Sequence, residues 1–311
     1  MIKKPSFSRQ HFVAIPCLLL LLNFSGCSDS DDDGKSNDMG NLVTENDDGN
    51  DDAIQETINT DGTSKFVLEL TAEQEAPPLD LADAKADAEL TIDKSTGAIS
   101  GTVDWSNLSS DITAAHVHRG FAGINGPALF ALEFVPQQPD VGAPDTVNPL
   151  RIPIGTSLDS DALAALSNGE LYINVHTSSN PGGEIRGQIV PIGVLLEDSE
   201  LSIEEVVEPE FASTATGLGV STVNESSGAI SATVFLTDLD DATAVEIRRG
   251  AVGENGELVM VLEMSADEAN TWRTLPASML TNTQIDDFKN EALYFNVISP
   301  RAAMGEIRGQ L

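Results

Sequence analysis

The sequence predicts an all-β protein: two tandem antiparallel β-sandwich or barrel-like domains with one short helix each, after a disordered acidic tether. Two observations support this prediction. One set of motifs occurs twice in the same order, since residues 95–100 are repeated at 226–231 and residues 183–188 at 305–310. Between the motifs, short runs of alternating apolar and polar residues are separated by turn-forming residues, a pattern typical of a sandwich or barrel.

The first 26 residues have the composition of an export signal. Basic residues precede a short apolar stretch at residues 12–22, which is too short to span a bilayer and is expected to be cleaved. The residues that follow resemble the bacterial lipobox, although Phe24 stands where leucine is usual. This resemblance implies that Cys27 is lipidated and becomes the first residue of the mature chain. A plain secretory signal that leaves Cys27 as a free thiol is the alternative.

Residues 27–63 predict the acidic tether. Between residues 28 and 63 there are twelve Asp or Glu and one basic residue, Lys35, a composition that cannot bury enough surface to fold. Asp29, Asp31, Asp33 and Gly34 match the opening of a calcium-binding EF-hand loop, but Gly40 stands where that loop needs glutamate. We therefore interpret this segment as a solvated spacer that attracts divalent ions loosely.

Charge and cysteine content limit the partners and the location. The formal net charge is −34, so nucleic acid is a poor partner, because its binding relies on basic residues that neutralise phosphates. Cys17 leaves with the signal, so no intramolecular disulfide is expected in the mature chain. A lipid anchor on Cys27 predicts an exported protein held on the cell envelope, facing the periplasm or the surface. Ser28 after the cysteine favours the outer membrane.

The first repeat, residues 64–192, contains eight predicted strands and one helix. Ser160 is placed to cap the helix, and Asn168 and Gly169 are placed to end it. The strands are expected at residues 66–70, 86–92, 98–105, 113–119, 128–134, 150–154, 170–176 and 184–190, and the helix at 160–166.

The second repeat, residues 193–311, follows the same order with a less regular start. Residues 197–208 are acidic and lack strong turn signals, so we interpret them as a junction that can contribute an edge strand. The strands are expected at residues 210–214, 219–223, 229–236, 242–248, 258–264, 271–275, 292–298 and 305–311, and the helix at 279–288.

A glycine-rich loop follows the fourth predicted strand in both repeats. Residues 120–127 have glycine at the same three offsets as residues 250–256. Glycine is the residue that adopts positive φ without strain, so we expect such backbone conformations here and a structural role for the loop.

Several of these segments resemble the CHRD domain, which was first described in chordin and is common in secreted bacterial proteins. The resemblance covers the whole first repeat, and its most specific part runs from Tyr172 to Gln188; the second repeat keeps the terminal motif but differs at every histidine. It implies a compact extracellular β-domain and names a fold better than an activity. The segments that carry it are residues 115–120, 126–127, 171–177 and 181–188.

Three histidines occur only in the first repeat. His116 and His118 alternate with apolar residues on one predicted strand, and His176 does so on another, so all three fall on the polar faces of their strands. If the two strands are neighbours, the imidazoles converge beside Glu184 and Arg186. Three imidazoles with an open fourth position suit zinc or copper.

Two other interpretations of the histidines stay open. They can hydrogen-bond to Tyr172, Asn174, Glu184 or backbone carbonyls in a polar surface network, or they can form a pH-sensitive patch. Glu184 and Arg186 are kept in both repeats and are expected to have structural roles across strands.

Three common catalytic patterns are missing from the sequence. There is no nucleophile elbow, phosphate loop or His-Glu-x-x-His helix, and the predicted domains contain no cysteine. Three histidines are also too few for a copper/zinc superoxide dismutase centre. The sequence therefore predicts an extracytoplasmic binding module for a protein or glycan, with a three-histidine metal site, and activity at that metal, as the alternative.

Overall fold

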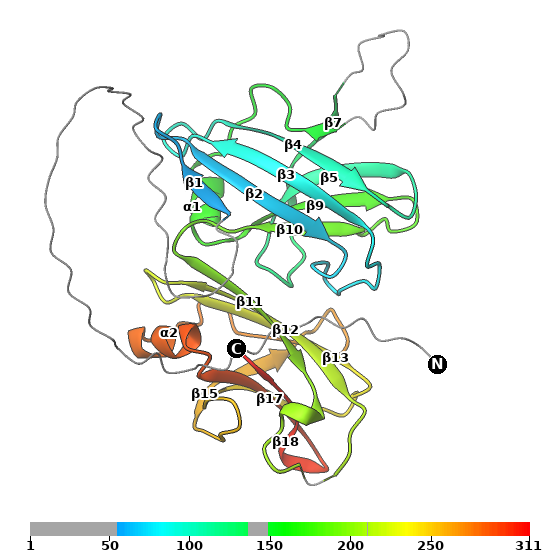
Figure 1. The fold of residues 1–311 in the computed structure, drawn as a ribbon, viewed down its shortest axis with the longest axis vertical. Coiled ribbons are helices and arrows are strands. Elements are labelled where there is room, and N and C mark those ends of the chain that lie inside the picture. The colour runs from blue at the N-terminus through cyan, green and yellow to red at the C-terminus, as the bar shows by residue number, and fades with distance from the viewer. Residues whose placement is uncertain (1–54, 136–148, 210) are drawn as a thin grey trace, which may run out of the picture. The chain divides into compact units, whose positions relative to one another are not determined.

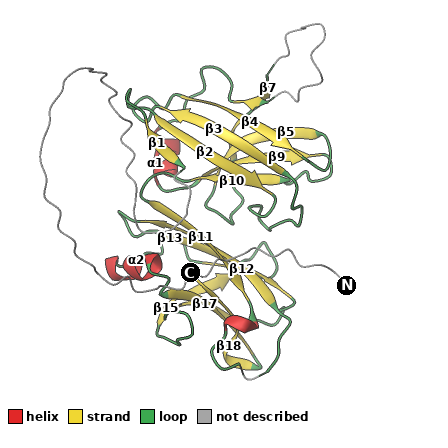
Figure 2. Ribbon diagram, in the orientation of Figure 1, coloured by secondary structure: helices red, strands yellow, loops and turns green. Residues whose placement is uncertain are grey.

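A computed structural model of the chain describes residues 55–135, 149–209 and 211–311 (Figure 1). The predicted export signal, Cys27 and residues 27–54 of the predicted tether lie outside these residues. Within the described ranges, no helix has the length and apolar character needed to cross a membrane. Strands predominate in both repeats (Figure 2). We call residues 64–192 domain one and residues 193–311 domain two.

Domain one is a single curled antiparallel sheet. Its strands follow the order β6-β5-β9-β10-β2-β3-β4-β8-β7, and β1 pairs with β2. The strands are β1 (Glu56–Ile58), β2 (Ser64–Thr71), β3 (Lys85–Ile92), β4 (Ile99–Ser106), β5 (Ile112–Arg119), β6 (Ala128–Ala131), β7 (Glu133–Phe134), β8 (Leu150–Arg151), β9 (Leu171–Thr177) and β10 (Ile185–Ile189).

The two ends of this sheet are joined by consecutive residues of the chain. β6 pairs with β5 and β7 pairs with β8, and only Leu132 separates β6 from β7. The sheet therefore curls until its first and last strands are one interrupted segment, which makes the domain barrel-like. The predicted strand at residues 128–134 is this segment.

Domain two repeats the same path with a continuous strand at the closure. β15 pairs with both β14 and β16, and Ser202 and Arg308 bridge the other two ends of the sheet. Its elements are β11 (Val194–Leu201), η1 (Ile203–Glu205), β12 (Thr216–Asn224), β13 (Ile230–Thr237), β14 (Ala244–Arg249), β15 (Leu258–Met264), β16 (Thr271–Arg273), β17 (Leu293–Ser299) and β18 (Ala302–Gln310). The predicted fold class is confirmed in both domains.

The cores follow the predicted alternation. On β5, Ala115 and Val117 are buried in the core of domain one, while His116 and His118, which alternate with them, face away. On β14, Val245 and Ile247 do the same in domain two. The histidines of β5 and the charged residues of β14 thus lie on the outer face of each sheet.

Each domain has one short helix, α1 (Ser160–Ser167) and α2 (Asn282–Lys289). The prediction that Ser160 caps α1 was wrong by one residue, because the Asp159 side chain accepts the 2.8 Å bond from the Ala162 backbone. Carboxylate and hydroxyl oxygens both cap helices well, so the sequence alone does not show whether Asp159 or Ser160 is the cap. In α2, Thr281 and Gln284 form a capping box.

Two further details differ from the predictions. β1 lies inside the range predicted as tether; it has only three residues, too few for an alternating pattern. No strand forms at residues 211–214, where one was expected. The predicted junction at residues 197–208 contains η1 and the last five residues of β11, which stands at the end of the strand order where an edge strand was expected.

The glycine-rich loop is also built differently from the prediction. Of its three glycines only Gly123 has a positive φ, of 74°. A Cβ on Gly120 would lie 2.6 Å from the Ile124 carbonyl oxygen, and a Cβ on Gly126 would lie 1.7 Å from that of Arg119. Two of the three glycines are therefore required by close backbone approach and not by φ.

Candidate metal centre

The pairing of β5 with β9 brings the three histidines together. His116 lies opposite Asn174, and His118 lies opposite Tyr172. His176 lies opposite Ala114, one position further along the same face. All three imidazoles are half-buried, and their ring centroids are 5.2–5.7 Å apart.

One nitrogen of each ring is available in this cluster. The three donor atoms lie within 4.8 Å of one another. His116 Nδ1, His118 Nε2 and His176 Nε2 are buried and have no hydrogen-bond partner. Zinc–nitrogen bonds of about 2.0–2.1 Å place tetrahedral ligands roughly 3.3 Å apart, a separation that small side-chain rotations reach from here. The donor set fits zinc or copper, which imidazole ligands suit.

Backbone carbonyls hold the opposite nitrogens of two rings. His118 Nδ1 lies 2.9 Å from the Gly126 carbonyl oxygen, and His176 Nδ1 lies 3.1 Å from that of Pro181. A carbonyl only accepts, so each Nδ1 carries the proton in the neutral ring and leaves the Nε2 lone pair free. A ligand histidine normally donates its other N–H to such an acceptor, which fixes the tautomer and the ring orientation.

Burial favours the neutral form of both rings. The pKa of His118 is lowered by burial first, and then by repulsion from His116, His176 and Arg186, against the Gly126 carbonyl. The pKa of His176 is lowered by burial and by repulsion from His116, against its own backbone contacts. Both lone pairs are therefore available at neutral pH.

Tyr172 and Arg186 form the frame around His118. The Tyr172 ring stacks on the His118 ring with centroids 5.0 Å apart, and its hydroxyl accepts a 3.0 Å bond from the Gly126 backbone. The Arg186 guanidinium carbon lies over the Tyr172 ring, 3.5 Å from its centroid. These contacts set the position of the Gly126 carbonyl that orients His118.

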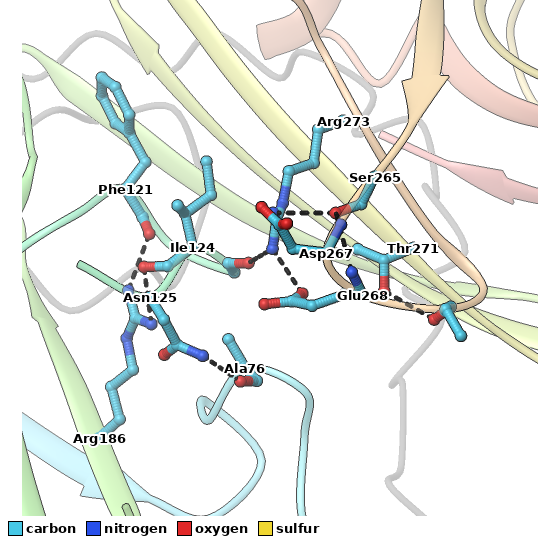
Figure 3. Close-up of polar contacts among 12 residues, drawn as sticks. Ala76, Phe121, Ile124, Asn125, Arg186, Ser265, Asp267, Glu268, Thr271 and Arg273 are labelled. Atoms are coloured by element: carbon cyan, nitrogen blue, oxygen red, sulfur yellow. Dashed lines mark hydrogen bonds and ion pairs between the residues drawn. The ribbon is translucent and has the colours of Figure 1, made fainter. Parts of the chain in front are cut away.

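Arg186 also holds the glycine-rich loop itself. It is 1% exposed and donates to the carbonyl oxygens of Phe121 at 2.8 Å and Ile124 at 3.2 Å (Figure 3). Asn125 of the same loop donates a 2.5 Å bond to the Ala76 carbonyl. Burial lowers the pKa of Arg186 to about 10, against attraction by Tyr172 and Glu75, and the group stays charged. Its role is to fix the loop.

Glu184 holds a different loop in place and forms no hydrogen bond with Arg186. Its buried carboxylate accepts bonds from the Ser109 backbone and hydroxyl at 2.5 Å, the Thr177 hydroxyl at 2.5 Å and the Asn180 amide at 3.0 Å. Burial alone would raise the pKa of Glu184, but the bonds from Ser109, Thr177 and Asn180 outweigh it and lower the pKa. The structural role expected of Glu184 is therefore to accept hydrogen bonds from Ser109, Thr177 and Asn180.

The family model of the CHRD domain matches the chain twice, at residues 66–189 and 198–311. The chain belongs to the CHRD domain family. Comparison with curated proteins and with solved structures gave no match. The two matched segments cover most of the chain, and each contains most of one curled sheet.

The second CHRD domain carries the same frame without histidine. Arg308 lies 3.5 Å over the Tyr294 ring and donates to the carbonyls of its own glycine-rich loop, as Arg186 does. Glu246 and Arg248 stand in place of His116 and His118 and form a 2.7 Å ion pair, and Ile298 stands in place of His176. A cavity of about 250 Å³ lies beside Arg248 and Ile298.

Three groups near the CHRD histidines were missed by sequence reasoning. Two are the carbonyls of Gly126 and Pro181, which every residue possesses and no sequence pattern marks. The third is Glu75, whose Oε2 accepts a 3.3 Å bond from Asn174, the residue opposite His116. Its only sequence signal is its place two residues before a pair of prolines and four residues after the end of β2.

Proposed function

We propose that domain one binds one zinc or copper ion through His116, His118 and His176. One observation carries the proposal: each histidine offers a ring nitrogen within 4.8 Å of those of the other two, and each has a buried ring nitrogen without a hydrogen-bond partner. An unpaired buried polar atom costs free energy, and three of them in one place are explained by a shared ligand.

The alternative, a polar surface network, is supported less well. A network can use the ring nitrogens on Tyr172, Asn174, Glu184 or backbone carbonyls, and two of the rings do contact backbone carbonyls. Such a network nevertheless leaves the other buried nitrogen of each of these rings without a partner. Three protein ligands also leave one coordination position open. A donor group of a protein or glycan partner would fit that position, as the binding-module interpretation requires.

Elemental analysis tests the metal proposal. The full-length chain, purified without a histidine tag and incubated with zinc or copper, is expected to retain one ion after dialysis. His118→Ala should retain none, because it removes one donor and its anchored ring. Arg248→Ala, at the same position of domain two, is the matched control and should keep the ion. A metal-free wild-type chain, or equal metal in His118→Ala, would refute the proposal.

We also propose that the chain is exported and anchored on the cell envelope by a lipid on Cys27, with the outer membrane favoured. The apolar stretch and the residues that precede Cys27 support this. Labelled fatty acid supplied to the producing cells is expected to enter the wild-type chain and not Cys27→Ala. Label that persists in Cys27→Ala would eliminate the anchor and leave the metal proposal untouched.

A further inference from the structure

Glu75 differs from Glu184, another buried carboxylate of domain one. Glu184 is 0% exposed and receives four hydrogen bonds. Glu75 is 5% exposed, yet its Oε1 has no partner and its Oε2 accepts one long bond from the Asn174 amide, at 3.3 Å. A carboxylate with so few donors is costly to bury in the ionised form.

A second oxygen without a partner lies beside it. Asn174 is 1% exposed and its Oδ1 also lacks a donor. Both oxygens lie against Gly183, since a Cβ built there would be 2.5 Å from each. A proton on Glu75 Oε1 supplies the missing donor, and with the Asn174 amide it closes a paired acid–amide arrangement of two hydrogen bonds.

The groups that face Glu75 come from two strands. Asn174 faces it from β9, and Arg186 faces it from β10. Burial raises the pKa of Glu75 to about 7, while Arg186, the Asn174 amide and the Ala76 backbone oppose the rise. The carboxyl group is therefore close to the balance between its two forms at neutral pH, and a nearby charge decides which one is present.

We propose that Glu75 compensates the charge of the metal ion: it is neutral while the site is empty and releases its proton to solvent when a divalent ion binds. The inference rests on the proposed function. The inference is based on position. The Asn174 side chain donates to Glu75, and Asn174 lies directly opposite His116 on the neighbouring strand. Among the hydrogen bonds of the described residues, none joins Glu75 directly to a histidine. Glu75 is thus a positioning and charge-compensating residue and not a ligand.

Domain two shows the arrangement without the metal ligands. Asn296 stands in place of Asn174 and donates to the Met304 carbonyl at 3.3 Å. The acid within electrostatic reach of Arg308 is Glu205, which is exposed. The buried acid and the three histidines therefore occur in the same domain and are both missing at the matching described positions of the other.

Proton release during metal binding tests the inference. Zinc is titrated calorimetrically into the metal-free full-length chain at about pH 6.5 in two buffers of different ionisation enthalpy, which together give the number of protons released. The wild type is expected to release about one proton more than Glu75→Gln, which keeps the shape of the neutral acid. Glu73→Gln removes the same charge from an exposed position and should match the wild type.

The zinc dissociation constant gives a second readout. We expect Glu75→Gln to bind zinc roughly tenfold more weakly than the wild type at pH 8, with a smaller gain in affinity between pH 6 and 8. Circular dichroism and the melting temperature verify that the variant folds. Equal proton release by the wild type and Glu75→Gln would overturn the inference alone. A wild type that binds neither zinc nor copper would instead overturn the proposed function.

Discussion

The outer faces of β5 and β9 in domain one and of β14 and β17 in domain two have the same register and different contents. His118 Nδ1 contacts the Gly126 carbonyl at 2.9 Å, and Arg248 Nε donates to the matching Gly256 carbonyl at 3.1 Å. The loop, the stacked tyrosine and the buried arginine are the same in both. The comparison separates a frame that belongs to the fold from side chains that one copy uses alone.

The charged and polar groups on the two outer faces are also paired in different ways. In domain two, Glu246 and Arg248 pair within one strand, at 2.7 Å, and neutralise each other. In domain one, the histidines present three free nitrogens, and the acid nearby is the buried Glu75. The face of domain two carries its own ion pair, whereas in the proposed function a cation completes the histidine face of domain one.

The largest expected effect comes from moving the histidines between the domains. Glu246→His, Arg248→His and Ile298→His together should create a second site, because the register and the Gly256 carbonyl are already in place. We expect two ions per chain by elemental analysis, where the wild type has one. The second ion should bind about 10–100-fold more weakly, since β18 begins near the point that matches Pro181 and alters the carbonyl that would orient the third ring.

The reciprocal variant provides the control for this transfer. His116→Glu, His118→Arg and His176→Ile in domain one should abolish metal retention and leave the fold intact, because domain two accommodates these residues on the same frame. If the domain-two triple variant folds and still gives one ion per chain, the shared frame is insufficient, and the metal site depends on groups outside β5 and β9.

The parts of this comparison that depend on strand periodicity could be predicted from the sequence. His116, His118 and His176 were placed on the polar faces because alternate residues of a strand share a face, and Val117 and Ile173 fixed which face is buried. The repeated motifs gave the two domains. Because the chain could be compared with itself, the frame and the variable side chains were separable without a structure.

Other parts of the site were beyond the sequence for physical reasons. Glu75 is one acid among many, and only the fold shows that it is buried beside Asn174. The carbonyls of Gly126 and Pro181 are backbone groups, whose positions depend on how two loops close over the sheet. Side-chain identity predicts faces well, but it does not predict which loop atoms reach them.

The second prediction concerns the pH dependence of stability in the metal-free chain. The folded pKa of Glu75, about 7, lies above its ordinary value of 4.5, so folding holds a proton that the unfolded chain releases. This contribution is full below pH 4.5 and is lost as the pH rises to about 7. Glu75→Gln lacks it, so between pH 4.5 and 7.5 the stability of domain one should rise by about 3 kcal/mol relative to the wild type.

The histidines act in the opposite direction and are common to both chains. Lowered folded pKa values at His118 and His176 give stability that is present above about pH 6.5 and lost as the pH falls. The difference between the wild type and Glu75→Gln therefore isolates Glu75. Urea titrations followed by Trp105 fluorescence in a Trp272→Phe background report on domain one. A constant difference across this pH range would contradict a neutral Glu75.

The smallest expected effect concerns the glycine-rich loops, and it separates their contribution to stability from their contribution to metal binding. A Cβ on Gly126 would lie 1.7 Å from the Arg119 carbonyl oxygen, and one on Gly256 would lie 1.3 Å from that of Arg249. Alanine at either position forces the loop to shift, so each variant should destabilise its own domain by about 1–3 kcal/mol in urea titrations. The two costs should be similar because the two loops are built alike.

Metal affinity should separate the two glycine variants. Gly126→Ala displaces the carbonyl that holds the His118 ring, and we expect zinc to bind roughly tenfold more weakly. Gly256→Ala displaces the carbonyl that Arg248 uses, and zinc binding should stay at the wild-type value. Equal zinc affinity in both variants would mean that the loop carbonyl does not orient His118, and that the frame common to the two domains serves stability alone.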